Sequence, residues 1–446
     1  MSHTRMAILA VLPALLAGVG MPPRPALADT PGTSVDLRLG GGMRIVRVRP
    51  AAGGEEAVRR LVAVSARHGG QEGPDVQPLV TYARPPLFGF LPRLAVMLTN
   101  KKKRDFDQDM THVLAQASPP GTDIGSPLNP PAEEHFVIGV LDSGANAHVI
   151  AEPYATELGL TWPYLTETPF STEGVGGSLD GVLSYPIGLF VAGLDAVAPD
   201  GRLDVLRTVG HYNVSVIATD ELNCGQGESL SALVGDPLLT FYKSIIRISQ
   251  PRVVEVGGVE YGSPDVQLVS TIPSGTLSQF PRSVPLTYSG QLPPQSCSYG
   301  WTLADDGPDL TTPSFPSVLS YMALLEEGGL YLVNVGMVQG EPGPLNPLQT
   351  FKFILDTGAQ ATLITENTAA NLGLDLFDPH FTVDVCGVGG LVSGIPGFFI
   401  DYVRINSSGP ATGLLEYEHA PVIVLNLPAG AGAAIGGLLG MNFFWN

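Results

Sequence analysis

The feature that most constrains the fold of this chain is a stretch of sequence that occurs twice. VLDSGANAHVIAEPYATELGL spans 140–160, and ILDTGAQATLITENTAANLGL spans 354–374, with no gap between the two copies. Asp142 pairs with Asp356 at an offset of 214 positions (356 − 142), and Gly144 and Leu160 meet identical residues at the same offset. An internal repeat of this kind predicts that one structural unit has been duplicated.

Further landmarks follow both copies in the same order. GVGG occurs at 174–177 and 387–390, and an apolar-apolar-Gly element occurs in LVGDPLL and LLGMNFF. We therefore predict two lobes of one design, joined by a segment rich in Pro and Ser. The predicted boundaries are 85–250 for the first lobe, 251–311 for the linker and 312–446 for the second lobe.

The local pattern is the same in each copy. Val137 to Leu141 and Phe351 to Leu355 are short apolar runs with β-branched and aromatic members, which predicts buried strands that end at the aspartates. The segments EPYATELGL and ENTAANLGL then predict a short helix that stops at Gly159 or Gly373. With 54 Gly, 40 Pro and only 15% charged residues, the composition favours many short strands, so the expected fold class is mostly β.

The N-terminal region has the pattern of an exported protein. Arg5, an apolar stretch and the small-x-small end Ala26 to Ala28 predict a signal peptide over 1–28, and hence a secreted or periplasmic location with no membrane span after its removal. Residues 29–84 are predicted to be a leader. Either an ordinary solvated segment or an inhibitory pro-segment over an acidic cleft is compatible with its basic character.

Charge and cysteine usage exclude several classes of site. A net charge of −19 argues against a nucleic-acid partner, because phosphates require a basic surface. Three cysteines allow at most one internal disulfide, so disulfides do not define the fold. Neither a Cys-x-x-Cys nor a His-Glu-x-x-His motif occurs, which predicts no metal and no cofactor.

The two aspartates acquire a chemical meaning through the duplication. A single Asp-Ser-Gly after a strand is usually a turn, because Asp bonds its own backbone and Gly accepts positive φ. In a duplicated chain, however, equivalent loops can meet at a pseudo-two-fold axis. If Asp142 and Asp356 meet there, ionising both carboxyls at once is unfavourable because their charges repel, so the pair holds one shared proton. Such a pair can take a proton from water and give one to a carbonyl, as amide hydrolysis requires.

Two Asp-Ser/Thr-Gly-Ala motifs, each after an apolar strand and before an apolar-apolar-Gly element, resemble the aspartic peptidases. The resemblance implies a bilobal acid-protease fold with two pseudo-symmetric, barrel-like lobes, short helices and the active site between the lobes. The GVGG segments are similar to the glycine-rich flap of the retroviral type, which implies tandem retropepsin-like lobes in one chain. The implied partner is a peptide or protein substrate, and the implied state is a monomer with an internal pseudo-dimer.

The resemblance assigns a role to each motif residue. Asp142 and Asp356 would be catalytic, with Ser143, Gly144, Thr357 and Gly358 supporting them. The flap residues would be Gly174, Val175, Gly176 and Gly177 in the first lobe, and Gly387, Val388, Gly389 and Gly390 in the second. Gly235 and Gly440 would fold under the catalytic loops. A flap over the site would exclude water and offer backbone donors to an extended peptide. Alternatively, GVGG is a simple hairpin turn.

The chain departs from the family pattern at three points, and two other functions are compatible with it. The mildest departure is that Asp142 is followed by Ser143 and Asp356 by Thr357, which the family accommodates. The first copy carries a polar insertion before PLNP, and the second copy has no counterpart of TFYKSIIRIS, the segment that follows the first under-loop glycine. The protein could therefore be a non-catalytic exported binding or structural module. VIGVLDSGA also looks like the aspartate motif of subtilisin-like serine peptidases, but the accompanying His and Ser motifs, HGTH and GTSMA, do not occur.

Overall fold

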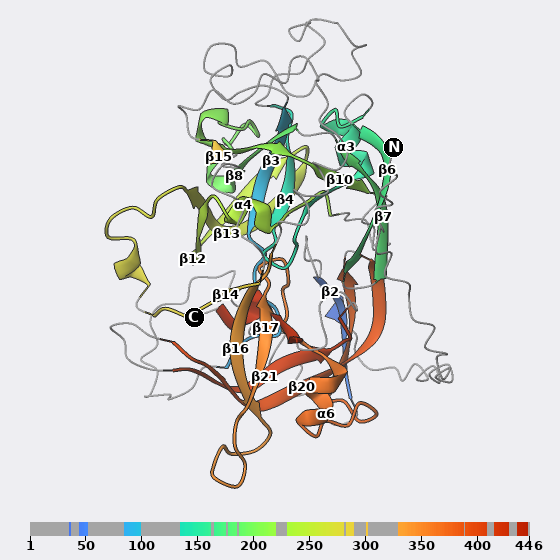
Figure 1. Ribbon diagram of the computed structural model, residues 1–446, viewed down its shortest axis with the longest axis vertical. Helices are drawn as coiled ribbons and strands as arrows, with labels where there is room; N and C mark the ends of the chain where they lie inside the picture. The colour runs from blue at the N-terminus through green and yellow to red at the C-terminus, as the bar shows by residue number, and fades with distance from the viewer. Residues whose placement is uncertain are drawn as a thin grey trace, which may run out of the picture. The chain divides into compact units, whose positions relative to one another are not determined.

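The computed structural model describes 35–36, 44–51, 84–99, 134–161, 165–174, 177–184, 187–219, 230–280, 282–289, 300–301, 329–387, 389–407, 414–427 and 435–444. Within these ranges the chain is mostly β with few and short helices (Figure 1), which confirms the expected fold class. The predicted signal peptide, residues 1–28, lies outside the described residues. Of the helices that are described, none combines the length and the apolar character of a membrane span.

One sheet collects the strands around the first copy of the repeat. Among the described residues it has ten strands, which pair in the order β15 (Gly300–Trp301), β9 (Val209–Val214), β8 (Ile187–Gly193), β3 (Arg93–Thr99), β4 (Val137–Leu141), β11 (Ala232–Val234), β5 (His148–Ala151), β10 (Val216–Thr219), β7 (Gly177–Ser184) and β6 (Leu165–Gly174). We call it the first sheet. Its central strands β4 and β11 run parallel, so both end at the same edge.

The second sheet collects the strands around the second copy. Its ten described strands pair in the order β1 (Val35–Asp36), β2 (Arg44–Pro50), β19 (Phe381–Gly387), β20 (Gly390–Ile405), β21 (Leu415–Val424), β18 (Leu363–Ile364), β22 (Ile435–Leu439), β17 (Gln349–Leu355), β16 (Tyr331–Val338) and β14 (Thr287–Tyr288). Because β20 also pairs with β16, the strands β16, β17, β22, β18, β21 and β20 close into a six-stranded barrel.

Local structure in the two copies follows the sequence prediction. β4 and β17 end immediately before Asp142 and Asp356. The helices α3 (Glu152–Glu157) and α6 (Glu366–Asn371) come next, and each is followed by a glycine with positive φ, 78° at Gly159 and 73° at Gly373. Only a glycine adopts this conformation without strain, which is why the helices stop there. The predicted strands and helices are thus confirmed.

A long hairpin departs from the predicted linker. β12 (Lys243–Val256) pairs with β13 (Val259–Val269) as a separate two-stranded sheet, and the turn between them has positive φ at Gly257 and Gly258. Residue 251, where the linker was expected to begin, lies inside this hairpin. Gly-Gly permits the tight turn, and Val266 packs into the core of the first sheet, so this stretch is strand. The remaining predicted boundaries stay predictions.

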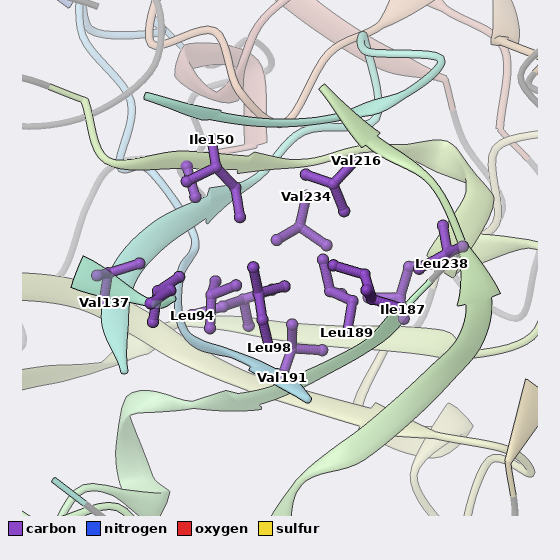
Figure 2. Close-up of a cluster of buried hydrophobic side chains, with 14 of the residues drawn as sticks. Leu94, Leu98, Val137, Ile150, Ile187, Leu189, Val191, Val216, Val234 and Leu238 are labelled. Atoms are coloured by element: carbon purple, nitrogen blue, oxygen red, sulfur yellow. The ribbon is translucent and has the colours of Figure 1, made fainter. Parts of the chain in front are cut away.

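The strands of the first sheet surround a buried hydrophobic core (Figure 2). Leu94, Val137, Ile150 and Val234 are buried there and point toward one another. Val, Ile and Leu make up most of this core, and the β-branched Val and Ile pack well on a pleated surface. Two further buried clusters fill the second sheet, and Phe353 and Phe381 are among their largest side chains. The two repeated strands β4 and β17 therefore rest on well-packed cores.

The remaining helical segments in the described ranges are single turns. They are α4 (Asp236–Leu239), η2 (Leu194–Ala196), η3 (Val205–Arg207), η4 (Leu277–Gln279) and η7 (Met441–Phe444). α4 directly follows Gly235 and η7 directly follows Gly440, so each predicted under-loop glycine stands between a central strand and a short helical turn.

Candidate active site

The two Asp-Ser/Thr-Gly loops are held in the same way by their neighbouring strands. The backbone N–H of Asp142 donates to the carbonyl of Val234 at 2.9 Å, and that of Asp356 donates to Leu439 at 3.0 Å. Both acceptors lie on the strand that runs parallel to the one ending at the aspartate. Each loop thus starts from a fixed backbone position at the edge of its sheet.

The structure brings the two predicted catalytic carboxyls together. The carboxyls of Asp142 and Asp356 interact with each other, and the residues are only 9% and 7% exposed. The glycines of the motif make this approach possible. A Cβ on Gly144 would lie 2.6 Å from Cγ of Asp356, and a Cβ on Gly358 would lie 2.4 Å from Cγ of Asp142. Any side chain at either position would collide with the opposite carboxyl.

Ser143 and Thr357 connect the loops through reciprocal hydrogen bonds. The N–H of Ser143 donates to Oγ1 of Thr357 at 3.0 Å, and the N–H of Thr357 donates to Oγ of Ser143 at 3.1 Å. Each hydroxyl also donates, at 2.7 Å, to the carbonyl before the opposite aspartate: Ser143 to Leu355, and Thr357 to Leu141. Four hydrogen bonds therefore fix the separation and orientation of the two loops.

Gly235 and Gly440 lie directly beneath these loops. A Cβ on Gly235 would be 2.3 Å from the carbonyl oxygen of Ala147, and one on Gly440 would be 2.4 Å from that of Ala361. The residue after each glycine donates its N–H to the loop at 2.8 Å, Asp236 to Ala145 and Met441 to Ala359. Both under-loop glycines allow a contact that a larger residue would prevent.

Burial sets the electrostatics of the carboxyl pair. Desolvation raises the pKa of Asp142 and raises the pKa of Asp356 well above its ordinary value, because a charged carboxylate loses its hydration there. The charge of Asp142 raises the pKa of Asp356 further. Backbone N–H groups of each loop, from Gly144 and Gly358 among others, act in the opposite direction by stabilising the ionised form. The balance favours a pair that retains a proton.

A third acid lies near the pair and was not singled out in the sequence. Asp236 is fully buried, and desolvation together with the charge of Asp142 raises its pKa to about 9. Neither of its carboxyl oxygens has a hydrogen-bond partner among the described residues. The second copy has Met441 at the equivalent position, so comparing LVGDPLL with LLGMNFF would have exposed this asymmetry.

The glycine-rich segments form the ends of two hairpins. Gly174 pairs with Gly177 between β6 and β7, and Gly387 pairs with Gly390 between β19 and β20. Gly390 has a φ of 106°, and no heavy atom lies within 4 Å of the position a Cβ would take. Gly389 is a turn residue, whereas Val175, Gly176 and Val388 lie outside the described residues. The hairpin interpretation holds for both segments, and a role as flaps stays a prediction.

Potential metal ligands do not cluster in the part of the chain that the structure describes. No group of three His, Cys, Asp or Glu side chains there is arranged to hold a metal ion. His148, which follows the first motif, is buried and accepts the N–H of Gly235 on Nδ1 at 3.1 Å. In the second copy Thr362 has the equivalent contact, because its Oγ1 accepts the N–H of Gly440 at 3.1 Å.

Comparison with known proteins identifies part of this arrangement. Residues 338–443 match the family model described as aspartyl protease. The matched segment contains Asp356, the second glycine-rich hairpin and Gly440, whereas Asp142 lies outside it. No curated protein matches the chain. The aspartyl protease match supports a hydrolase of the protease class and agrees with the family that the repeated motifs resemble.

Proposed function

We propose that the protein is an aspartic endopeptidase in which Asp142 and Asp356 activate a water molecule. The observation that carries this proposal is the juxtaposition of two buried carboxyls, one from each copy of the repeat, each packed against the motif glycine of the other loop. The aspartyl protease match over 338–443 supports the part of the proposal that concerns Asp356, which lies inside the matched segment.

The geometry suits general acid and base catalysis. With one proton shared between the carboxyls, the ionised group takes a proton from water while the protonated group gives one to the substrate carbonyl. Oδ1 of Asp356 is buried and makes no hydrogen bond to the described residues, so one acceptor of the pair is unused. Because the pKa values are raised, the pair keeps its shared proton at pH values above those at which a carboxyl ordinarily loses it.

Strand pairing supports a bilobal, pseudo-symmetric architecture with tandem retropepsin-like lobes as part of this proposal. The first sheet contains the succession β3, β4, β11, β5, β10 and β7, and the second contains β16, β17, β22, β18, β21 and β20. Each succession places the repeated Asp strand second and the strand before the under-loop glycine third. The site between the lobes, a monomeric internal pseudo-dimer, a peptide or protein substrate and an extracytoplasmic location belong to the same proposal.

A cleavage assay with single carboxyl replacements tests the proposal. An unfolded protein substrate is incubated at several pH values from about 3 to 7 with the parent, Asp142→Asn and Asp356→Asn. Each replacement is expected to reduce the rate by about 100-fold or more, because general acid and base catalysis commonly contributes that much. Asp200→Asn, in an exposed turn of the first sheet, is the matched control and is expected to retain the parent rate.

The same assay separates the alternatives. A peptide whose hydroxyl mimics the tetrahedral intermediate is expected to block cleavage, whereas a serine-directed reagent is not. Cleavage that persists in both Asp→Asn variants would refute the proposal, and sensitivity only to the serine reagent would favour a subtilisin-like enzyme. A folded parent that cleaves nothing at any of these pH values would indicate the non-catalytic module.

A further inference from the structure

The predicted leader contributes a strand to the second glycine-rich hairpin. β2 pairs with β19 from Pro50 opposite Phe381 to Arg44 opposite Cys386, one residue before the paired glycines of the tip. Figure 1 shows β2 in blue beside the red strands of the second sheet. Val48 is fully buried in the same cluster as Phe381 and Val383. β2 is therefore part of the core of this sheet.

An ion pair links β2 to the hairpin. Both guanidinium nitrogens of Arg49 donate to the carboxylate of Asp384, NH1 to Oδ1 at 2.8 Å and NH2 to Oδ2 at 2.9 Å. Two parallel hydrogen bonds of this kind fix orientation as well as distance. Asp384 is only 5% exposed, so these hydrogen bonds satisfy carboxylate oxygens that have little access to water.

Asp384 also reaches the other strand of the hairpin. Its Oδ1 accepts the N–H of Gly394, which has a φ of 70°, at 2.9 Å. The pairing of β19 with β20 shifts register between Val383 and Val385, next to this contact. One carboxylate thus connects β2, β19 and the irregular point of β20. A strand bends at a register shift of this kind, and the bend changes the direction of the hairpin. Asp384 and Arg49 therefore act at the point that determines this direction.

The first hairpin lacks a comparable neighbour in the part of the chain that is described. β6 is the terminal strand of the first sheet there and pairs only with β7. The equivalent strand β19 lies between β2 and β20. In addition, Cys386 of β19 takes part in a disulfide bond. The two hairpins, although both end in GVGG, are therefore held differently.

We propose that the leader strand Arg44–Pro50 is a permanent component of the second hairpin, and that Arg49 is a positioning residue that sets this hairpin for a peptide substrate by holding Asp384. The role in substrate positioning rests on the proposed function. Removal of β2 would uncover Val383 and Phe381. It would also leave the buried carboxylate of Asp384 without the guanidinium of Arg49, which is strongly unfavourable.

Cutting the full chain tests whether the leader stays. A recognition sequence for a specific protease is inserted between residues 60 and 70, and the folded protein is cut and passed over a size-exclusion column without denaturant. The N-terminal fragment is expected to co-elute with the body, and any proteolytic activity to change less than about twofold, because β2 retains its contacts. Separation of the fragment, with or without a rise in activity, would overturn the proposal.

Replacing Arg49 tests its positioning role. In Arg49→Gln, hydrogen exchange of the amides in 381–387 is expected to accelerate by about tenfold, whereas that of the amides in 177–184 is unchanged. Arg49→Lys keeps the charge but loses the bidentate contact, so its exchange rate over 381–387 should lie between those of the parent and Arg49→Gln. Arg202→Gln, which removes an exposed ion pair with Glu134, is the matched control. Unchanged exchange over 381–387, or equal acceleration in both hairpins, would contradict the proposal.

Kinetics complete the test if the proposed function holds. Arg49→Gln is expected to raise KM by about three- to tenfold while kcat changes less than twofold, because substrate contacts are weakened and the carboxyl pair is untouched. A fall in kcat with constant KM contradicts a positioning role. If Asp142→Asn retains cleavage, the proposed function fails, but the co-elution and exchange results still decide whether β2 is a permanent strand.

Discussion

Ser143 and Thr357 lie 214 positions apart, and the backbone N–H of each donates a hydrogen bond to the hydroxyl oxygen of the other, at 3.0 and 3.1 Å. Each residue is both donor and acceptor toward the other loop, so neither loop can shift without breaking two hydrogen bonds. The relationship explains why both copies carry a small hydroxyl residue directly after the aspartate. It also leads to the first prediction.

Thr357→Val is expected to lower the free energy of unfolding by about 1 to 3 kcal/mol, because it removes the acceptor for Ser143 and the donor to Leu141 while keeping the side-chain volume. Thr350→Val, at an exposed position of β17, is the matched control. Urea unfolding of both variants measures the difference. Equal stability of the two variants would show that the reciprocal contacts contribute little.

Gly144→Ala is expected to abolish most proteolytic activity while the protein still folds. The new Cβ would lie 2.6 Å from Cγ of Asp356, so the carboxyl pair must separate. A loss of about 100-fold or more is expected, since a displacement of about 1 Å can have that effect. Gly262→Ala, where no atom lies within 4 Å of the new Cβ, is the control. The rate of cleavage and the circular dichroism spectrum of each variant are measured.

The raised pKa of Asp356 leads to a prediction of how the stability of the folded protein depends on pH. Its pKa is raised in the folded state, so the folded protein binds a proton that the unfolded chain releases near its ordinary pKa of about 3.9. Stability is therefore expected to fall as pH rises from about 4 toward the raised folded pKa. Asp356→Asn, which cannot ionise, should flatten this fall. Denaturation at pH 4, 5.5 and 7 measures it, and a parent-like slope in the variant would contradict the assignment.

Asp236 extends the same dependence to higher pH. Its pKa of about 9 means that the unfolded chain, but not the folded one, loses this proton across the range from about 4 to 9. Asp236→Asn is expected to stabilise the protein at pH 7 to 8 and to leave its stability at pH 3 nearly unchanged. Asp375→Asn, in the exposed segment after α6, is the control. A loss of stability at pH 8 in Asp236→Asn would disprove the prediction.

The repeat was sufficient to predict the local elements of the site. Strand, Asp-Ser/Thr-Gly turn, strand and glycine-terminated helix recur in both copies, because each depends on neighbouring residues: apolar runs, a turn-forming aspartate and a glycine at positive φ. The prediction that Gly235 and Gly440 lie under the loops came from the resemblance to the aspartic peptidases, and the backbone contacts of both glycines agree with it.

Features that depend on contacts across long stretches of sequence were not predicted. The hairpin β12 to β13 is a different case: its residues from 251 on were assigned to the linker, although Gly257-Gly258 between two alternating segments is a local turn signal. The buried carboxyl of Asp236 has an ordinary sequence setting, and only packing removes its water. Likewise, the leader gave no sign that Arg49 would meet Asp384, 335 residues away.

By itself, the sequence determined which residues are equivalent and which turns and caps they form, because those depend on chemistry within a few positions. Only the tertiary structure decided that the carboxyls of Asp142 and Asp356 lie together in a buried site and that β2 joins the second sheet beside β19. Both features follow from the pairing of strands distant in sequence. The desolvation that raises the pKa values of the carboxyls exists only once those strands have packed together.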